Sequence, residues 1–320
     1  MFIMLPLSHV QTTEMHTLFL TLGFLLAIAQ ATRYGVPDNR VHQFAGYLGI
    51  PSTDPTLIGN CTTDKIYFSC GGSLVSIPGF PSRRIYLTAR HCLLARDVPT
   101  NKFLVQFGDS DPRILGTTPD CTRVLGVKSP SYSATYAWFP PLANTKSGGP
   151  ENSNGAVVGL KEDYGIILLD TPVSVADVDQ EAVIFNSSGQ VNLNVPLVGL
   201  AGYGIVGYGS LLGGTLGQPV PTNGDRNKNY VEQSVRSTQP TNILCAGNAA
   251  QLQQSSCSGD SGSASFSPSK LNGAFNVYGV ETSGDVYCRG ISTKTRVGTS
   301  AFFIWLNSIK ADVIATAAKK

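Results

Sequence analysis

Short apolar or alternating segments, separated by glycine, proline, asparagine and aspartate, run through most of the chain. Alternation of apolar and polar residues over about four to eight positions is typical of half-buried β-strands. On this basis we predict strands at Gln43–Gly49, Lys65–Cys70, Gly72–Ser76, Arg84–Thr88, Phe103–Phe107, Arg123–Val127, Ile166–Leu169, Val195–Leu200, Asn229–Ser237, Ser263–Phe266, Ala274–Glu281 and Lys294–Val297. Short strands at this spacing indicate an all-β sandwich or barrel.

Three other segments depart from the strand pattern. Ser129–Asn154 and Gly204–Lys228 are rich in glycine, proline and small polar residues, which predicts two long loops. Near the C-terminus apolar residues recur at helical spacing, and Ser300 offers an N-cap hydroxyl, so we predict a helix from Ser300 to Thr316. The string Gly202–Gly207 fits a dinucleotide-binding pattern, but the Gly- and Pro-rich segment after it cannot supply the required helix. We interpret it as strand and loop.

Composition and charge narrow the class of protein. Hydrophobic residues make up 42% of the 320, which allows one large core or two small ones. Lys and Arg number 23 against 21 Asp and Glu, without any basic run, which argues against a nucleic-acid partner. The 34 glycines and 19 prolines are scattered along the chain and favour many short strands over a helical bundle.

The N-terminal segment predicts export. Thr17–Gln30 is an apolar run of the length of a signal-peptide core. Its end overlaps Ala29-Gln30-Ala31, which has small residues at the two positions that a signal peptidase recognises. The run is shorter than the roughly 20 residues of a spanning helix. We predict a signal peptide over residues 1–31, a secreted chain from Thr32 and no membrane association after its removal. A membrane anchor and a buried helix are the alternatives.

An exported chain with many cysteines is expected to form disulfides. Since their number is odd, at least one thiol is left over. The cysteines are Cys61, Cys70, Cys92, Cys121, Cys245, Cys257 and Cys288. Asn60 and Asn186 each begin a triplet of the N-glycosylation type.

Histidine is scarce, and the secreted chain would retain only His42 and His91. With the cysteines oxidised, too few ligands remain for zinc, and we expect no metal and no cofactor. An imidazole base at neutral pH must therefore be one of these two residues. His91 ends an apolar strand and precedes Cys92, so a Cys70–Cys92 bridge would pin its loop. The alternative for His91 is a structural loop histidine, and we interpret His42 as a packing or surface residue.

A glycine-rich turn surrounds Ser261, in the order Gly259-Asp260-Ser261-Gly262. A serine hydroxyl becomes a good nucleophile only when a neighbouring base removes its proton. Glycines on both sides let the backbone approach a substrate closely. They also let the amides of Gly259 and Ser261 point at one spot, as an oxyanion hole requires. A serine turn without catalytic function is the alternative.

Asp163 opens an apolar strand that ends at Asp170. A carboxylate at the start of a buried strand is costly unless it is hydrogen-bonded, and an imidazole N–H is a suitable partner. The alternative for Asp163 is a turn or capping residue. Asp170 belongs to the turn that follows the strand.

The segments around these residues resemble three signatures of the chymotrypsin/trypsin-like serine proteases, and they occur in that family's chain order. The signatures are Leu87–Cys92, Asp163–Leu168 and Gly259–Gly262. The likeness extends from about Tyr47 to about Leu306, and Tyr34–His42 is similar to openings seen in secreted microbial and fungal branches.

The resemblance implies an all-β fold of two six-stranded antiparallel β-barrels with a C-terminal α-helix. An N-terminal segment at 32–46, with a pro-segment as one interpretation, would precede a first lobe at 47–185 and a second lobe at 186–320. Ser261 would attack a peptide carbonyl, His91 would take and return its proton, and Asp163 would orient His91. The amides of Gly259 and Ser261 would hold the oxyanion. Such a protein is a secreted, monomeric serine endopeptidase whose partners are protein or peptide substrates and protein inhibitors.

The resemblance also implies a specificity pocket. Its floor would be Ser255, Cys257–Cys288 would border it, and the strand pairing with substrate would be Thr282, Ser283 and Gly284. A neutral hydroxyl at the floor offers nothing to Lys or Arg, so we expect cleavage after apolar or aromatic residues. Among the other cysteines, Cys61–Cys121 is a candidate bridge, and Cys245 is free or pairs with one of those two.

In one respect the chain departs from the family, whose activated N-terminal amine pairs with the aspartate before the nucleophile. Asp260 is present, but cleavage after Arg40 would expose Val41-His42-Gln43, which matches the family motif only in its first residue. The alternative function is a catalytically inactive, protease-like binding protein. An α/β-hydrolase esterase is disfavoured because it requires the order Ser, acid, His. A structural surface protein is supported only by the Gly and Ser content.

Overall fold

The computed structural model describes residues 36–51, 66–93, 103–108, 130–140, 162–186, 197–202, 228–247, 256, 259–284 and 291–320. Several sequence predictions lie outside these residues. They are the signal peptide, the acceptor at Asn60, the strand Arg123–Val127, the loop that precedes Lys228, the bridges Cys61–Cys121 and Cys257–Cys288, and the pocket floor at Ser255.

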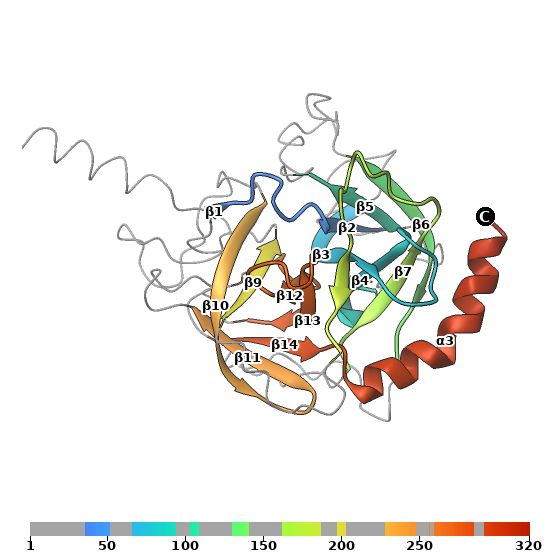
Figure 1. Cartoon of the computed structure of the whole chain (residues 1–320). Helices are drawn as coiled ribbons and strands as arrows, with labels where there is room; N and C mark the ends of the chain where they lie inside the picture. Colours follow the sequence, from blue (N-terminus) through green and yellow to red (C-terminus); the bar gives the residue numbers. More distant parts are fainter. Residues whose placement is uncertain are drawn as a thin grey trace, which may run out of the picture.

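The first barrel is a closed ring of antiparallel strands (Figure 1). Its strands are β2 (Ala45–Pro51), β3 (Ile66–Ser76), β4 (Ile85–Thr88), β5 (Phe103–Phe107), β6 (Ser131–Trp138) and β7 (Gly165–Leu169). They pair in the order β3-β2-β5-β6-β7-β4, and β4 returns to β3. Leu48, Leu74 and Ile167 are fully buried in its core. Closure leaves no unpaired strand edge within the ring.

The second barrel repeats this plan. Its strands are β9 (Leu197–Gly202), β10 (Asn229–Thr238), β11 (Asn242–Gly247), β12 (Ala264–Phe266), β13 (Asn276–Ser283) and β14 (Ile291–Arg296). They pair in the order β12-β9-β10-β11-β14-β13, and β13 returns to β12. Between the barrels, β8 (Ala182–Ile184) pairs in parallel with β3 and with β13. The predicted architecture of two six-stranded antiparallel barrels is confirmed.

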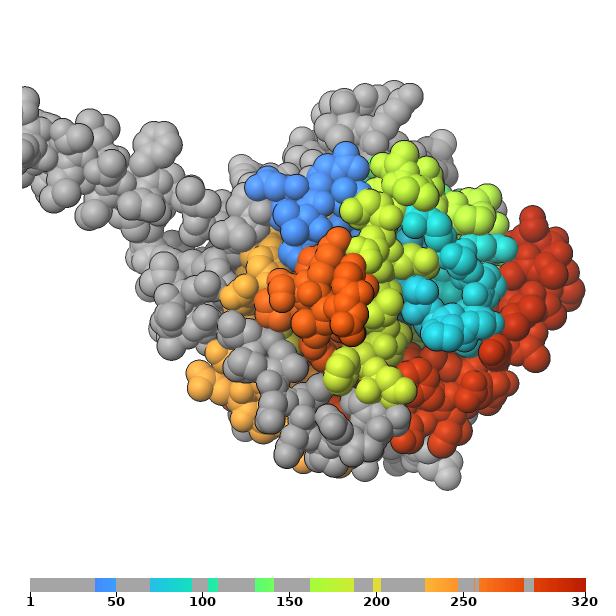
Figure 2. Space-filling view, in the orientation of Figure 1, coloured from blue at the N-terminus to red at the C-terminus, as the bar shows by residue number. Residues whose placement is uncertain are grey.

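The predicted C-terminal helix is confirmed as α3 (Ser300–Ala318), which lies along the outside of the first barrel (Figures 1 and 2). By length and composition α3 could span a membrane. However, Phe302 and Trp305 pack on Tyr164, one residue after Asp163. The prediction of Ser300 as N-cap is wrong: the hydroxyl of Thr299 accepts the Phe302 amide at 3.2 Å, because Thr299 has the extended backbone of a cap.

Some strand predictions need correction. β6 lies inside the segment predicted as the loop Ser129–Asn154, because its aromatic residues fill positions between β5 and β7. The serines and prolines of the wider segment concealed this half-exposed strand. Two predicted strands, Lys65–Cys70 and Gly72–Ser76, form the single strand β3, and β11 was not predicted.

A buried ionic cluster joins the N-terminal segment to the second barrel. There, β1 (Val36–Pro37) pairs with β10, and Asp38 follows directly. One Asp38 oxygen lies 2.5 Å from His42 Nδ1 and the other lies 3.0 Å from Lys228 Nζ. The His42 ring stacks on Tyr230 at 4.6 Å and His42 is 4% exposed, so of the two interpretations, packing or surface residue, the first is correct.

Asp38→Asn should lower the free energy of unfolding by about 3–5 kcal/mol, because it leaves the buried Lys228 without its carboxylate. Burial raises the pKa of Asp38, but His42 and Lys228 outweigh it and hold this pKa below its ordinary value. The contribution is therefore present above about pH 4 and is lost as pH falls further. Urea unfolding at pH 7 and pH 3 measures it, with the exposed Asp179→Asn as control. Equal stability of both variants at pH 7 would refute the ionic cluster.

Candidate active site

His91 is positioned by a short helical turn after β4. That turn, η1 (Arg90–Cys92), follows the buried strand directly, and a disulfide joins Cys92 to Cys70 on β3. The predicted Cys70–Cys92 bridge is thus confirmed. Within the part of the chain that the structure describes, the imidazole remains 32% exposed, so a reactant can reach it.

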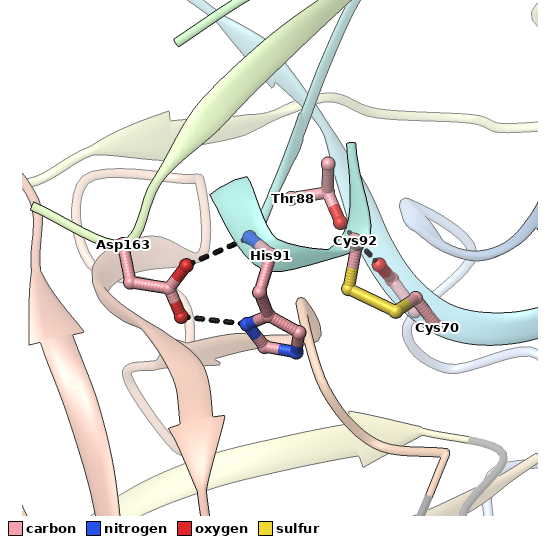
Figure 3. Close-up of a disulfide and its surroundings, with 6 residues drawn as sticks. Cys70, Thr88, His91, Cys92 and Asp163 are labelled. Carbon is pink, nitrogen blue, oxygen red and sulfur yellow. Dashed lines mark hydrogen bonds and ion pairs between the residues drawn. A yellow bond between two sulfur atoms is a disulfide. The ribbon is translucent and has the colours of Figure 1, made fainter. Parts of the chain in front are cut away.

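Asp163 holds His91 with both carboxylate oxygens (Figure 3). Oδ1 accepts the His91 backbone amide at 2.9 Å, and Oδ2 lies 2.7 Å from Nδ1. Because a carboxylate only accepts, Nδ1 carries the proton and the lone pair of the neutral ring lies on Nε2. Figure 3 shows this second nitrogen directed away from Asp163. Asp163 is fully buried, so this bidentate contact takes the place of solvent around it.

A buried cation lies near this pair. Arg90 is 5% exposed, and its guanidinium lies 5.3 Å from the Phe139 ring centre. Burial lowers the pKa of Arg90, while the charges of Asp163 and Glu162 raise it. Sequence reasoning did not identify Arg90 as part of the site, since its neighbours come from residues about 70 positions further on.

Ser261 lies in a sharp turn, Gly259–Gly262, which we name the serine turn. Gly259 and Gly262 have φ values of 97° and 85°, in the left-handed region that favours glycine. A Cβ at Gly262 would also collide with the Thr88 hydroxyl and the Gly71 carbonyl. The glycines predicted to let the backbone approach closely are thus required by the turn's own conformation.

Three successive links attach the serine turn to the segment Ala89–Cys92, which we name the histidine loop. The Gly71 amide donates to the Ser261 carbonyl at 2.7 Å, and the Thr88 hydroxyl donates to the Gly71 carbonyl at 2.8 Å. The neighbouring Cys70 is bonded to Cys92, which follows His91. The backbones of Ser261 and His91 are therefore tied to the middle of β3, at Cys70 and Gly71. The Ser261 hydroxyl and the His91 ring make no hydrogen bond to each other, a contact that often tightens only when substrate binds.

Two backbone amides of the serine turn are available to an external acceptor. Among the described residues, no hydrogen-bond acceptor takes the amide of Gly259 or that of Ser261. The Gly262 and Ser263 amides, by contrast, donate to Glu281 and Asp260 at 2.8 and 2.9 Å. Two amides without an internal partner, beside a serine, are what an oxyanion requires.

The segment predicted to pair with substrate ends β13. Thr282 is buried, and its hydroxyl lies 2.7 Å from that of Thr295 on β14. Its side chain therefore packs inside the second barrel. Ser283 and Gly284 are partly exposed. A Cβ at Gly284 would lie 3.3 Å from the hydroxyl of Ser256, five residues before Ser261. The segment therefore lies close to Ser256.

Two further predictions concern the cysteines. Cys245 is a free, buried thiol, which decides among the alternatives left open by the sequence. Its partners across β10 and β14 are Val235 and Ser292, so neither neighbouring strand places a cysteine opposite it. Although Cys70, His91 and Cys92 cluster closely, both sulfurs belong to the disulfide and cannot act as thiolate ligands to a metal.

Comparison with known proteins shows which known fold the chain shares. No protein-family model matches the sequence, and no curated protein matches it. Among solved structures, 692 chains match. One of them, described as the atomic-resolution structure of HBP, is 16% identical, with a TM-score of 0.52 over 85% of this chain and 92% of that chain. HBP has a chymotrypsin-like fold, and so does the chain.

Proposed function

We propose that the chain is a serine endopeptidase that acts through an acyl-enzyme intermediate. The observation that carries the proposal is the bidentate contact of Asp163 with His91, in a loop tied by a disulfide and by Gly71 to the turn of Ser261. An imidazole held in one tautomer, with its other nitrogen available, is the arrangement that a general base needs.

In the first step the Ser261 oxygen bonds to the peptide carbonyl carbon while its proton moves to His91 Nε2. The carbonyl electron pair moves to oxygen, and the amides of Gly259 and Ser261 bind that oxyanion. His91 then returns the proton to the leaving nitrogen as the C–N bond breaks. A water molecule repeats the sequence on the acyl-enzyme and releases the acid, and Asp163 stabilises the imidazolium in both halves.

For specificity we propose cleavage after apolar or aromatic residues, on the basis of the neutral Ser255. The charges around the next residue, Ser256, support this choice. Glu281, whose carboxylate accepts the Ser256 hydroxyl at 3.1 Å, also forms a buried ion pair with Lys294. Because this carboxylate is already neutralised, it does not offer a charge to a Lys or Arg side chain of a substrate.

We also propose that the protein is secreted after cleavage at Ala31. The Cys70–Cys92 disulfide is typical of oxidising compartments. Asn186, which begins a glycosylation triplet, is exposed at the end of β8. As a monomer, the secreted chain would meet protein or peptide substrates and protein inhibitors.

A mixed peptide library tests activity and specificity together. The secreted chain should cut after large apolar or aromatic residues, and treatment with an organophosphonate beforehand should abolish cutting. A strict preference for Lys or Arg would contradict the pocket interpretation. Absence of cutting by a folded, processed sample would favour the alternative of a protease-like binding protein.

A further inference from the structure

A fully buried lysine lies in the second barrel, and the proposed mechanism does not use it. Lys294 on β14 has no exposed surface. Its ammonium donates to the Ser292 hydroxyl at 2.8 Å and forms an ion pair with Glu281 on β13. A charged amine in a protein interior is costly even when paired, so it invites a functional explanation.

Glu281 connects this lysine to the serine turn through its backbone and to the preceding Ser256 through its side chain. Its carbonyl accepts the Gly262 amide at 2.8 Å, and its amide donates to the Ser263 carbonyl at 2.9 Å. Its carboxylate accepts the Ser256 hydroxyl at 3.1 Å. One residue thus contacts the chain on both sides of Ser261, and Lys294 fixes the direction of its side chain.

Asp260 brings a second carboxylate under the influence of Lys294. It immediately precedes Ser261 and is fully buried, and its carboxylate lies where a Cβ at Gly202 would be. The charge of Asp260 raises the pKa of Lys294.

The groups around Lys294 come from each strand packed on it. Glu281 faces it from β13, Asp260 from the serine turn and Cys245 from β11, while Gln233 on β10 contacts the same Ser292 hydroxyl. Burial lowers the pKa of Lys294 to about 8, and the Cys245 and Asp260 charges oppose that shift. Near neutral pH Lys294 is therefore mostly in its ammonium form, beside the acidic side chains of Glu281 and Asp260.

We infer that Lys294 is a positioning residue, whose ammonium attracts Glu281 and Asp260 and so fixes the serine turn in the conformation that acyl transfer needs. The inference rests on the proposed function. Without this cation, the buried Glu281 carboxylate would lose its ion pair, and a shift of Glu281 would move the Gly262 backbone bonded to it and displace the amides of Gly259 and Ser261.

The inference has a pH signature that a purely structural role lacks. Lys294 is charged below about pH 8 and neutral above it, so reactivity of Ser261 should fall as pH rises through 8. Stability has the opposite sign. Because burial penalises the charged form, deprotonation of Lys294 removes a cost, and its titration does not lower the free energy of unfolding.

The test measures the labelling rate of the full secreted chain by a fluorophosphonate between pH 7 and pH 9.5. For a group of pKa near 8, the wild-type rate should fall about 30-fold over this range. Lys294→Met should label about 100-fold more slowly at pH 7, as when an oxyanion donor is lost. Lys294→Arg, always charged, should retain most of the rate and show no decline.

Lys228→Met is the matched control, since it removes a buried lysine of the N-terminal cluster that does not contact the serine turn. It should be less stable but label at the wild-type rate with the wild-type pH decline. Absence of labelling in the wild type at every pH would overturn the proposed function itself. Labelling of the wild type with no alkaline decline, or with the same decline in Lys294→Arg, would overturn only the inference, even if Lys294→Met does not fold.

Discussion

Ser261→Ala is expected to lower kcat for peptide hydrolysis about 10⁶-fold, with little change in KM. The variant removes the atom that bonds to the carbonyl carbon. It leaves in place the His91–Asp163 contact and the hydrogen bond from the Gly71 amide to the carbonyl of residue 261. Initial rates on a peptide cleaved by the wild type give the measurement.

Ser267→Ala is the control for this experiment. Ser267 is buried, and its hydroxyl accepts the Asn276 amide at the end of β12, away from the histidine loop. Its removal should leave kcat unchanged. If Ser261→Ala retained one hundredth of the activity or more, another nucleophile would be responsible for the reaction.

Asp163→Asn is expected to lower kcat about 10⁴-fold. The carboxylate accepts from both the His91 amide and Nδ1, and asparagine has only one side-chain oxygen for these two donors. An amide NH₂ facing Nδ1 would favour the tautomer with its proton on Nε2, and that ring cannot take the serine proton. Steady-state kinetics at neutral pH would show the loss in kcat.

Asp170→Asn provides the comparison at the other end of β7. Asp170 is partly exposed and pairs with Lys320 near the C-terminus. The Asp170→Asn substitution should lower the free energy of unfolding slightly and leave kcat unchanged. A loss of less than tenfold in Asp163→Asn, or equal losses in both variants, would contradict the role assigned to Asp163.

The architecture followed from the sequence where the pattern was strong. Strands such as β4 and β7 are apolar and fully buried, so their composition alone marked them. β6 was missed because its side chains alternate irregularly between exposed and partly buried, and its position depends on pairing with β5 and β7. The capping role of Thr299 instead of Ser300 depends on one backbone angle that the sequence does not determine.

At the site, local signatures were sufficient for some contacts and not for others. His91, Asp163 and the Cys70–Cys92 bridge stand in recognisable segments, and the structure brings them together. Lys294 and Glu281 carry no local signature, since they meet only when β13 and β14 pair in register. Ser261 is joined to this group through its backbone, and its reaction with His91 as base is the central proposal.

The most direct measurement of that proposal is the position of a fluorophosphonate adduct in the secreted chain, mapped by peptide mass spectrometry. We predict a single adduct on Ser261, and its loss in a folded His91→Ala variant. An adduct on a different residue, no adduct in a correctly folded sample, or labelling of Ser261 that is unaffected by loss of His91 would contradict the account.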